Sequence, residues 1–155
     1  MHNKKGFTLV ELMIIIALFG VVAAFSFPFF RSRNVQHILD ASSDELHGIL
    51  RQAQGRAMSG HNASAWGVHW GTGEYTLFSG DEYDTRDTDH DLIIDYPGSI
   101  TISTSVNVSG ATYPEDVVFD QLTGTTDASG TITITSSISD VERFTVSTQG
   151  QIERQ

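Results

Sequence analysis

The residues whose chemistry stands out are carboxylates in two unlike settings. Glu11 is the only ionisable residue in the run from Phe7 to Phe30. An acidic stretch over residues 81–95 holds seven acids and a single arginine. A lone carboxylate within an apolar run, such as Glu11, needs a cationic partner when it is buried away from water. Clustered carboxylates of the second kind supply the oxygen ligands that calcium prefers.

Within the acidic stretch, Asp87, Asp89 and Asp91 alternate as acids do in a calcium-binding loop of the EF-hand type. The match then fails, because the sixth position is Leu92 rather than glycine and the twelfth is Gly98 rather than glutamate. We therefore expect a solvated acidic loop. The three aspartates remain a calcium candidate, and no other metal or cofactor is expected.

No enzyme motif accompanies these carboxylates in the sequence. The six histidines are scattered without an HExxH pair, and there is no G-x-S-x-G elbow or phosphate-binding glycine loop. The chain has no cysteine, which excludes disulfides, thiolate zinc sites and a cysteine nucleophile. We expect a protein that is not an enzyme. Trp66, Trp70, Tyr75 and Phe78 suit a hydrophobic core, and the alternative is an exposed aromatic platform for a ligand.

The element that positions Glu11 is an apolar run. Residues 12–27 are apolar with two exceptions, and about twenty such residues cross a hydrocarbon core of roughly 30 Å as a helix. A cleaved secretory signal is the alternative, with residues 22–24 as its small-residue cut site. Glu11 and the apolar residues beyond that site favour retention. We predict a transmembrane helix over residues 7–30, kinked or loosened at Pro28.

An amphipathic pattern continues this helix over residues 31–60. Apolar residues recur at spacings of three and four from Val35 to Ala57, with charged residues between them, which predicts one buried face. Residues 61–155 show short alternating stretches separated by glycine turns, which is typical of antiparallel strands. The predicted strands are residues 66–70, 74–79, 92–96, 100–106, 117–119, 131–136, 143–147 and 151–153.

These elements predict an α+β fold. It consists of a long N-terminal helix, transmembrane in its first half and amphipathic in its second, packed on a small antiparallel β-sandwich. Residues 61–155 form the β-rich globular domain, and one sheet face should bury the apolar stripe of the helix.

The sequence around Glu11 resembles the processing site of the type IV pilin superfamily. The string KKGFTLVEL contains this residue and precedes the charge-free run with its Pro28, as in that family. The resemblance implies a leader peptide over residues 1–6, cut after Gly6 by a prepilin peptidase. The same enzyme would N-methylate Phe7.

The spacing of Glu11 from the new N-terminus has a chemical reason. A carboxylate at bilayer depth costs at least about 2.5 kcal/mol unless it finds a partner. The methylated amine of Phe7 on a neighbouring subunit stays cationic and would supply that partner, which would set the register of assembly. The alternative is that Glu11 reaches the lipid headgroups by itself. Glu11 and Pro28 are therefore the predicted assembly residues.

The later part of the chain is similar to the GspH/FimT branch of that superfamily, through the strand and turn order around Tyr75 to Phe78, Val118 to Asp120, Gly130 to Ile134, Phe144 to Ser147 and Gly150 to Ile152. That branch contains minor pseudopilins of type II secretion systems and minor pilins of type IV pili. The resemblance implies a structural subunit that primes or tips such a filament. The sequence leaves open which of the two assemblies it serves.

The implied location is the cytoplasmic (inner) membrane, with a single span and the globular domain outside the cytoplasm, and the periplasm or cell surface after assembly. The implied partners are the prepilin peptidase and methylase, and other pilins or pseudopilins through the N-terminal helix. The alternative function is a tip ligand-binding module, either an adhesin or a DNA-uptake receptor. The formal net charge of -10 disfavours nucleic acid as a partner, because both are negative.

Overall fold

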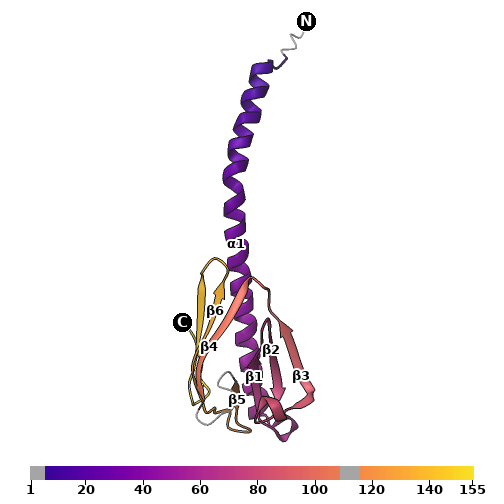
Figure 1. The fold of residues 1–155 in the computed structure, drawn as a ribbon, viewed down its shortest axis with the longest axis vertical. Coiled ribbons are helices and arrows are strands. Elements are labelled where there is room, and N and C mark those ends of the chain that lie inside the picture. The colour runs from indigo at the N-terminus through magenta and orange to yellow at the C-terminus, as the bar shows by residue number, and fades with distance from the viewer. Residues whose placement is uncertain (1–5, 109–115) are drawn as a thin grey trace. The chain divides into compact units, whose positions relative to one another are not determined.

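The structure is a computed structural model that describes residues 6–108 and 116–155, without the side chains of residues 24–33, 107 and 108. The chain divides into two compact units, Met1–Asn34 and Val35–Gln155. Helix α1 (Leu9–Met58) contributes to both units, and all strands belong to the second (Figure 1). The expected helix over residues 7–60 is thus confirmed to within two residues.

Helix α1 ends where the sequence places a glycine. Gly60 adopts a left-handed φ of 66°, and its N–H donates to the Ala57 carbonyl at 3.0 Å. Glycine reaches this conformation without the penalty that a Cβ brings, so it commonly follows a helix. Pro28 lies inside α1, but its side chain is outside the description, so the predicted kink remains a prediction.

In the described part of the second unit, two four-stranded antiparallel sheets follow the helix. The first has the strand order β3-β2-β1-β5 and the second has the order β4-β6-β7-β8. The strands are β1 (Trp66–Trp70), β2 (Glu74–Ser79), β3 (Asp87–Asp95), β4 (Ile100–Val108), β5 (Val117–Phe119), β6 (Ala128–Ser136), β7 (Val141–Val146) and β8 (Ile152–Arg154). Each predicted strand is present, and β1, β2 and β5 have the predicted bounds.

The hairpin of β1 and β2 shows how alternation sets the faces of the first sheet. The register pairs Trp66 with Ser79 and Trp70 with Tyr75. Side chains alternate across a strand, so both tryptophans face the core and His69 faces the other side. Gly67 also lies on that other side, and it is a glycine because a Cβ there would lie 2.6 Å from the Phe78 ring. The sequence predicted both strands with a glycine turn between them, and the structure pairs them as a hairpin.

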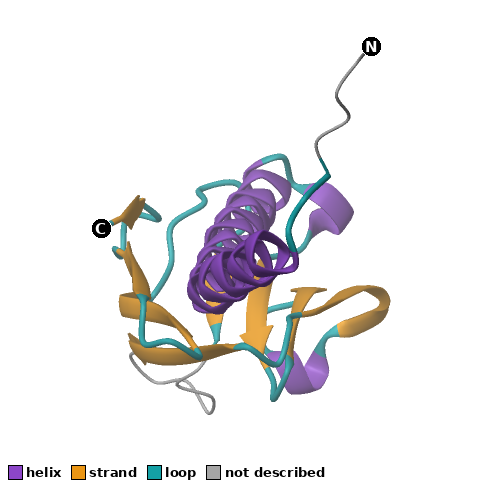
Figure 2. Ribbon diagram, turned by 90° about the horizontal axis from the view of Figure 1, so that it is seen from above, coloured by secondary structure: helices purple, strands orange, loops and turns teal. Residues whose placement is uncertain are grey.

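The hydrophobic core is shared by α1 and both sheets. Leu46, Leu50 and Ala53 of the helix are fully buried, together with Phe119 of the first sheet and Phe144 of the second. In the end-on view, strands border the helix on different sides (Figure 2). The predicted apolar stripe therefore lies in the core. Because every member of this core falls after Asn34, we expect residues 34–155 to fold on their own.

The structure corrects two expectations. The sequence suggested a loop over residues 81–95, whereas β3 begins at Asp87 and only the preceding part is irregular. Aspartate is rare in strands, so the first residues of β3 did not look like a strand. Charged residues nevertheless suit a strand at a sheet edge. Two antiparallel sheets are present as expected, but both of them share the core with the helix, whereas the sequence suggested that one sheet face would bury its apolar stripe.

Candidate functional site

The junction between Gly6 and Phe7 lies in an open segment just before α1. Phe7 is 79% exposed, although its side chain is a large apolar ring. A Cβ added to Gly6 would meet nothing within 4 Å. The described packing therefore imposes no requirement for glycine at this position. Both residues of the predicted cleavage site are accessible.

Thr8 caps the start of the helix. Its Oγ1 accepts a hydrogen bond from the Glu11 N–H at 3.2 Å, and its carbonyl accepts one from the Leu12 N–H at 3.2 Å. The Thr-x-x-Glu spacing is that of a capping box, and an acid in the first turn also suits the helix dipole. Sequence reasoning missed this cap, although the four-residue pattern is present in the sequence.

The helix segment after the cap is apolar on every side. Its large side chains are between 55% and 74% exposed, with Ile15 as a partly buried exception. The exposed large apolar residues of this helix segment are Leu9, Val10, Leu12, Met13, Ile14, Ile16, Leu18, Phe19, Val21 and Val22, and the exposed Phe7 precedes them. A soluble monomer seldom exposes so large a continuous apolar surface, and such surfaces mark contacts with protein or lipid.

The described part of the chain contains no helix that is both long and apolar enough to meet the criteria for a membrane span.

The calcium candidate lies on the edge strand β3. Asp91 pairs with Arg86 at 2.8 Å between Oδ2 and Nε, and Asp87 pairs with His90 at 2.9 Å between Oδ2 and Nδ1. Asp89 donates its backbone N–H to Asp87 at 3.1 Å. Among the described residues, no group of three or more acids, histidines or cysteines is arranged to hold a metal ion. An extended strand also cannot wrap oxygens around one ion as an EF-hand loop does.

The aromatic residues of the first hairpin are buried. Trp66 and Phe78 are fully buried, and Trp70 and Tyr75 are nearly so. The alternative of an exposed aromatic platform is therefore wrong. Burial raises the pKa of the Tyr75 hydroxyl, and the negative charge of Glu45 acts in the same direction.

The outer face of the first sheet carries a stacked group that sequence reasoning did not find. His69 Nδ1 lies 2.5 Å from Asp116 Oδ1, and its ring stacks on Tyr83 with centroids 3.6 Å apart. The Arg86 guanidinium lies over the Tyr83 ring, 3.7 Å from its centre, in a cation–π contact. These contacts hold the short turn that contains Tyr83 against β1. The only sequence signal for this group was the alternation around His69, which places its side chain on the outer face of the sheet.

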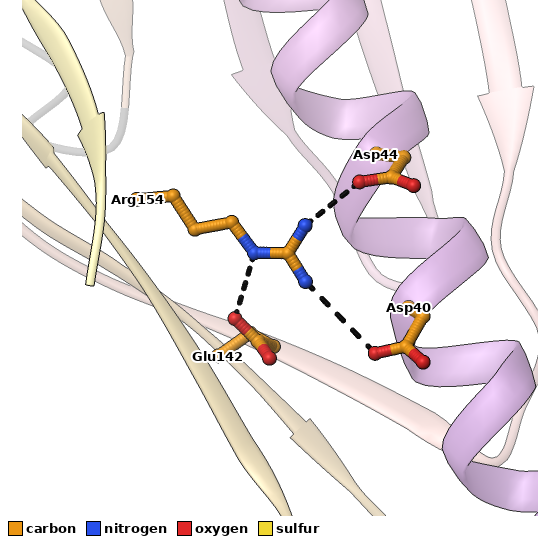
Figure 3. A network of polar contacts seen from close by, with 4 residues as sticks. All are labelled: Asp40, Asp44, Glu142 and Arg154. Atoms are coloured by element: carbon orange, nitrogen blue, oxygen red, sulfur yellow. Dashed lines mark hydrogen bonds and ion pairs between the residues drawn. The ribbon is translucent and has the colours of Figure 1, made fainter.

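Arg154 joins the C-terminal strand to the helix (Figure 3). Its guanidinium contacts Asp44 at 2.7 Å, Glu142 at 2.9 Å and Asp40 at 3.9 Å. The hydrogen bond to Glu142 raises the pKa of the guanidinium. Three carboxylates more than neutralise this arginine, which is one of two basic residues after Arg86. That balance disfavours a role for it in binding nucleic acid.

Two sequence profiles match the chain in succession. The profile of the prokaryotic N-terminal methylation motif matches residues 1–27. The profile of the type II transport protein GspH matches residues 42–150, which is more than half of the chain. This chain belongs to the GspH family. The resemblance inferred from the residues around Gly6 and from the strand order is thereby confirmed.

Relatives and folds agree with the family. The chain is 52% identical over 31 residues to the fimbrial protein EcpB of Eikenella corrodens, which covers 20% of each protein. It is 30% identical over 60 residues to a fimbrial protein of Pseudomonas aeruginosa, which covers 39% of each. The matched segments are thus well under half the length of these relatives.

The fold is similar to that of the minor pseudopilin EpsH from the type 2 secretion system of Vibrio cholerae. The TM-score is 0.55 at 13% identity, and the match covers 75% of this chain and 94% of that one. At this identity the likeness establishes the fold: an N-terminal helix packed on antiparallel sheets. The predicted fold class is confirmed at this level, and the transmembrane character of the first half of the helix is a separate matter.

Proposed function

We propose that this chain is a structural minor pseudopilin or minor pilin without catalytic activity, which primes or tips a type II secretion pseudopilus or a type IV pilus. The observation that carries the proposal is the uncovered apolar helix segment directly after the Gly6–Phe7 junction. A protein that folds its own domain yet leaves such a segment bare needs a lipid or protein environment for it. Membership of the GspH family supports the same conclusion.

Processing is the first step of the proposed function. A prepilin peptidase removes residues 1–6 and N-methylates Phe7. The described packing does not require glycine at Gly6. We therefore propose that the peptidase is what requires a glycine there. Gly6→Val should leave an uncut precursor on an immunoblot. Gly20→Val is the matched control, because Gly20 is equally uncrowded, and this variant should be cut normally.

Before assembly, residues 7–30 anchor the chain in the cytoplasmic membrane as a single span. Lys4 and Lys5 precede the apolar run, and positive residues favour the cytoplasmic side. The globular domain then lies outside the cytoplasm, and the assembled subunit lies in the periplasm or at the cell surface. Carbonate extraction of membranes should leave the uncut and the cut chain in the pellet, and release into the supernatant would contradict this anchor.

Assembly is the second step, and Glu11 is its proposed determinant, with Pro28 shaping the same helix. The Glu11 carboxylate pairs with the cationic amine of Phe7 on a neighbouring subunit, which removes the cost of an unpaired charge in an apolar setting. Glu11 also lies in the capping box with Thr8. A test must therefore separate its charge from its part in the helix start.

Two substitutions make that separation. Glutamine keeps the hydrogen-bonding capacity that a capping box uses at this position but carries no charge. Glu11→Gln and Glu11→Ala should both be cut and both fail to enter filaments or crosslink to a partner pilin. If Glu11→Gln assembles as the wild type does while Glu11→Ala fails, the residue acts through the helix start and the proposed pairing is wrong.

A further inference from the structure

Strand β3 leaves one edge of the first sheet open. It is the outermost strand in the order β3-β2-β1-β5, and its only strand partner in the described chain is β2. All of its residues except Asp91 and Ile94 are exposed. Figure 1 draws β3 at the margin of its sheet, beyond β2. The ladder with β2 is regular from Leu92 to Asp95, and its register shifts between Leu92 and Asp87. An uncovered edge of this kind can template a further strand.

The direction of the free backbone groups follows from the ladder with β2. The Tyr96 N–H donates to the Gly73 carbonyl at 3.0 Å, which fixes Tyr96 as a hydrogen-bonded position facing β2. Bonded and non-bonded positions alternate along an antiparallel strand. The N–H and C=O groups of Ile93 and Asp95 therefore point away from β2, toward the open edge.

The side chains along this edge have a definite pattern. Leu92 is 40% exposed and Ile93 is 57% exposed, on opposite faces of the strand. Asp89 and Asp95 flank this apolar centre and are exposed as well. In contrast, Asp91 is engaged by Arg86. The edge thus combines free backbone groups, an apolar centre and unneutralised negative charge at both ends.

We propose that the open edge of β3 binds an extended segment of a partner protein by strand addition, and that this segment carries basic residues on either side of an apolar centre. Backbone hydrogen bonds would supply affinity and the alternate side chains would supply selectivity, as in other complexes formed by strand addition. Opposite charges facing each other across paired strands stabilise them, and like charges destabilise them.

Charge complementarity decides against a second copy of this chain as the occupant. Antiparallel pairing of two β3 edges would bring the aspartates of one strand close to those of the other. The formal net charge of -10 adds long-range repulsion between copies. A basic segment from a different protein meets neither obstacle.

The test uses the full chain in a nonionic detergent and a fluorescent nine-residue peptide of the pattern Lys-Thr-Lys-Val-Ile-Val-Lys-Thr-Lys. Two further peptides carry N-methyl groups on alternate amides, one on the odd positions and one on the even positions. Strand addition uses only one set of amides. The unmodified peptide and one methylated peptide should therefore bind, and the other should bind at least tenfold more weakly. Equal binding of both methylated peptides, loss of both, or no binding of the parent peptide overturns the proposal.

Ile93→Pro provides the matching change in the protein. Proline removes an N–H that points to the open edge and spares the ladder to β2, and it is tolerated at such positions of edge strands. We expect at least tenfold weaker peptide binding for Ile93→Pro and binding within twofold of wild type for Ile93→Thr. Binding of Ile93→Pro at the wild-type level contradicts strand addition. If Ile93→Pro does not fold, the pair of methylated peptides still decides the question.

Discussion

Replacing Gly150 by alanine should destabilise the globular domain through a contact among three separate elements. Gly150 has a φ of 77°, and a Cβ there would lie 2.1 Å from the Gly124 carbonyl oxygen and 2.6 Å from Gln54 Nε2. That amide nitrogen donates to the Gly124 carbonyl at 3.1 Å and to the Gly150 carbonyl at 2.8 Å. The methyl group must therefore displace the bridge by which α1 holds two turns.

The size of the effect follows from two contributions. A left-handed backbone costs a residue with a Cβ about 1–2 kcal/mol. Displacing both the Gly124 carbonyl and the Gln54 amide breaks the two hydrogen bonds of Gln54, each worth about 0.5–1.5 kcal/mol net. Gly150→Ala should therefore lower the free energy of unfolding by about 2–5 kcal/mol.

Gly73→Ala isolates the first contribution. Gly73 has a φ of 87°, but a Cβ there would meet nothing within 4 Å, so this variant should lose only about 1–2 kcal/mol. Urea unfolding of residues 34–155, followed by the fluorescence of the buried Trp66 and Trp70, measures both losses. Equal losses for the two variants would refute the reasoning, because the close approach at Gly150 would then have no energetic consequence.

Three further results are expected from the same domain. Arg154→Met should lower the free energy of unfolding by only about 1 kcal/mol, and by less in high salt, because its partner Asp44 is 73% exposed and water screens such pairs. A loss of unfolding free energy that does not change with salt in urea titrations would contradict this. The raised pKa of Tyr75 gives no pH dependence below about pH 10, where folded and unfolded chains both keep the proton. Above it only the unfolded chain ionises, so the free energy of unfolding should fall with rising pH, and Tyr75→Phe should flatten that fall. Calcium should raise the melting temperature no more than sodium chloride of equal ionic strength, and a shift specific to micromolar calcium would establish a site at Asp87, Asp89 and Asp91.

The helix and most strands were predictable because their signals are periodic. The spacing of three and four from Val35 to Ala57 matches a helix that buries one face, and that face is buried. The alternation of Trp66 to Trp70 and the glycine turn after it encode the first hairpin. Such patterns reflect burial on one side of an element, which the linear sequence records.

The remaining features depend on contacts between distant segments. Nothing local in the sequence indicates that the Gly124 and Gly150 turns meet at Gln54, or that Arg154 reaches the helix. Strand β3 was placed too late because its first residues are aspartates, whose weak strand preference is offset by an exposed edge position.

The N-terminal motif was predictable from the sequence, and the geometry around it was less so. The string around Gly6 and Phe7 identified the methylation motif. The helix cap formed by Thr8 was missed, although the Thr-x-x-Glu spacing is present in the sequence.

The central claim is that this chain is processed as a pilin-like subunit and keeps its apolar helix. Intact-mass and N-terminal sequence analysis of the mature protein from membranes tests it most directly. The account predicts a chain that begins at Phe7 and carries a methyl group on its α-amine. A mature chain that begins at Phe25 would contradict the account, because the apolar run would then be a cleaved secretory signal.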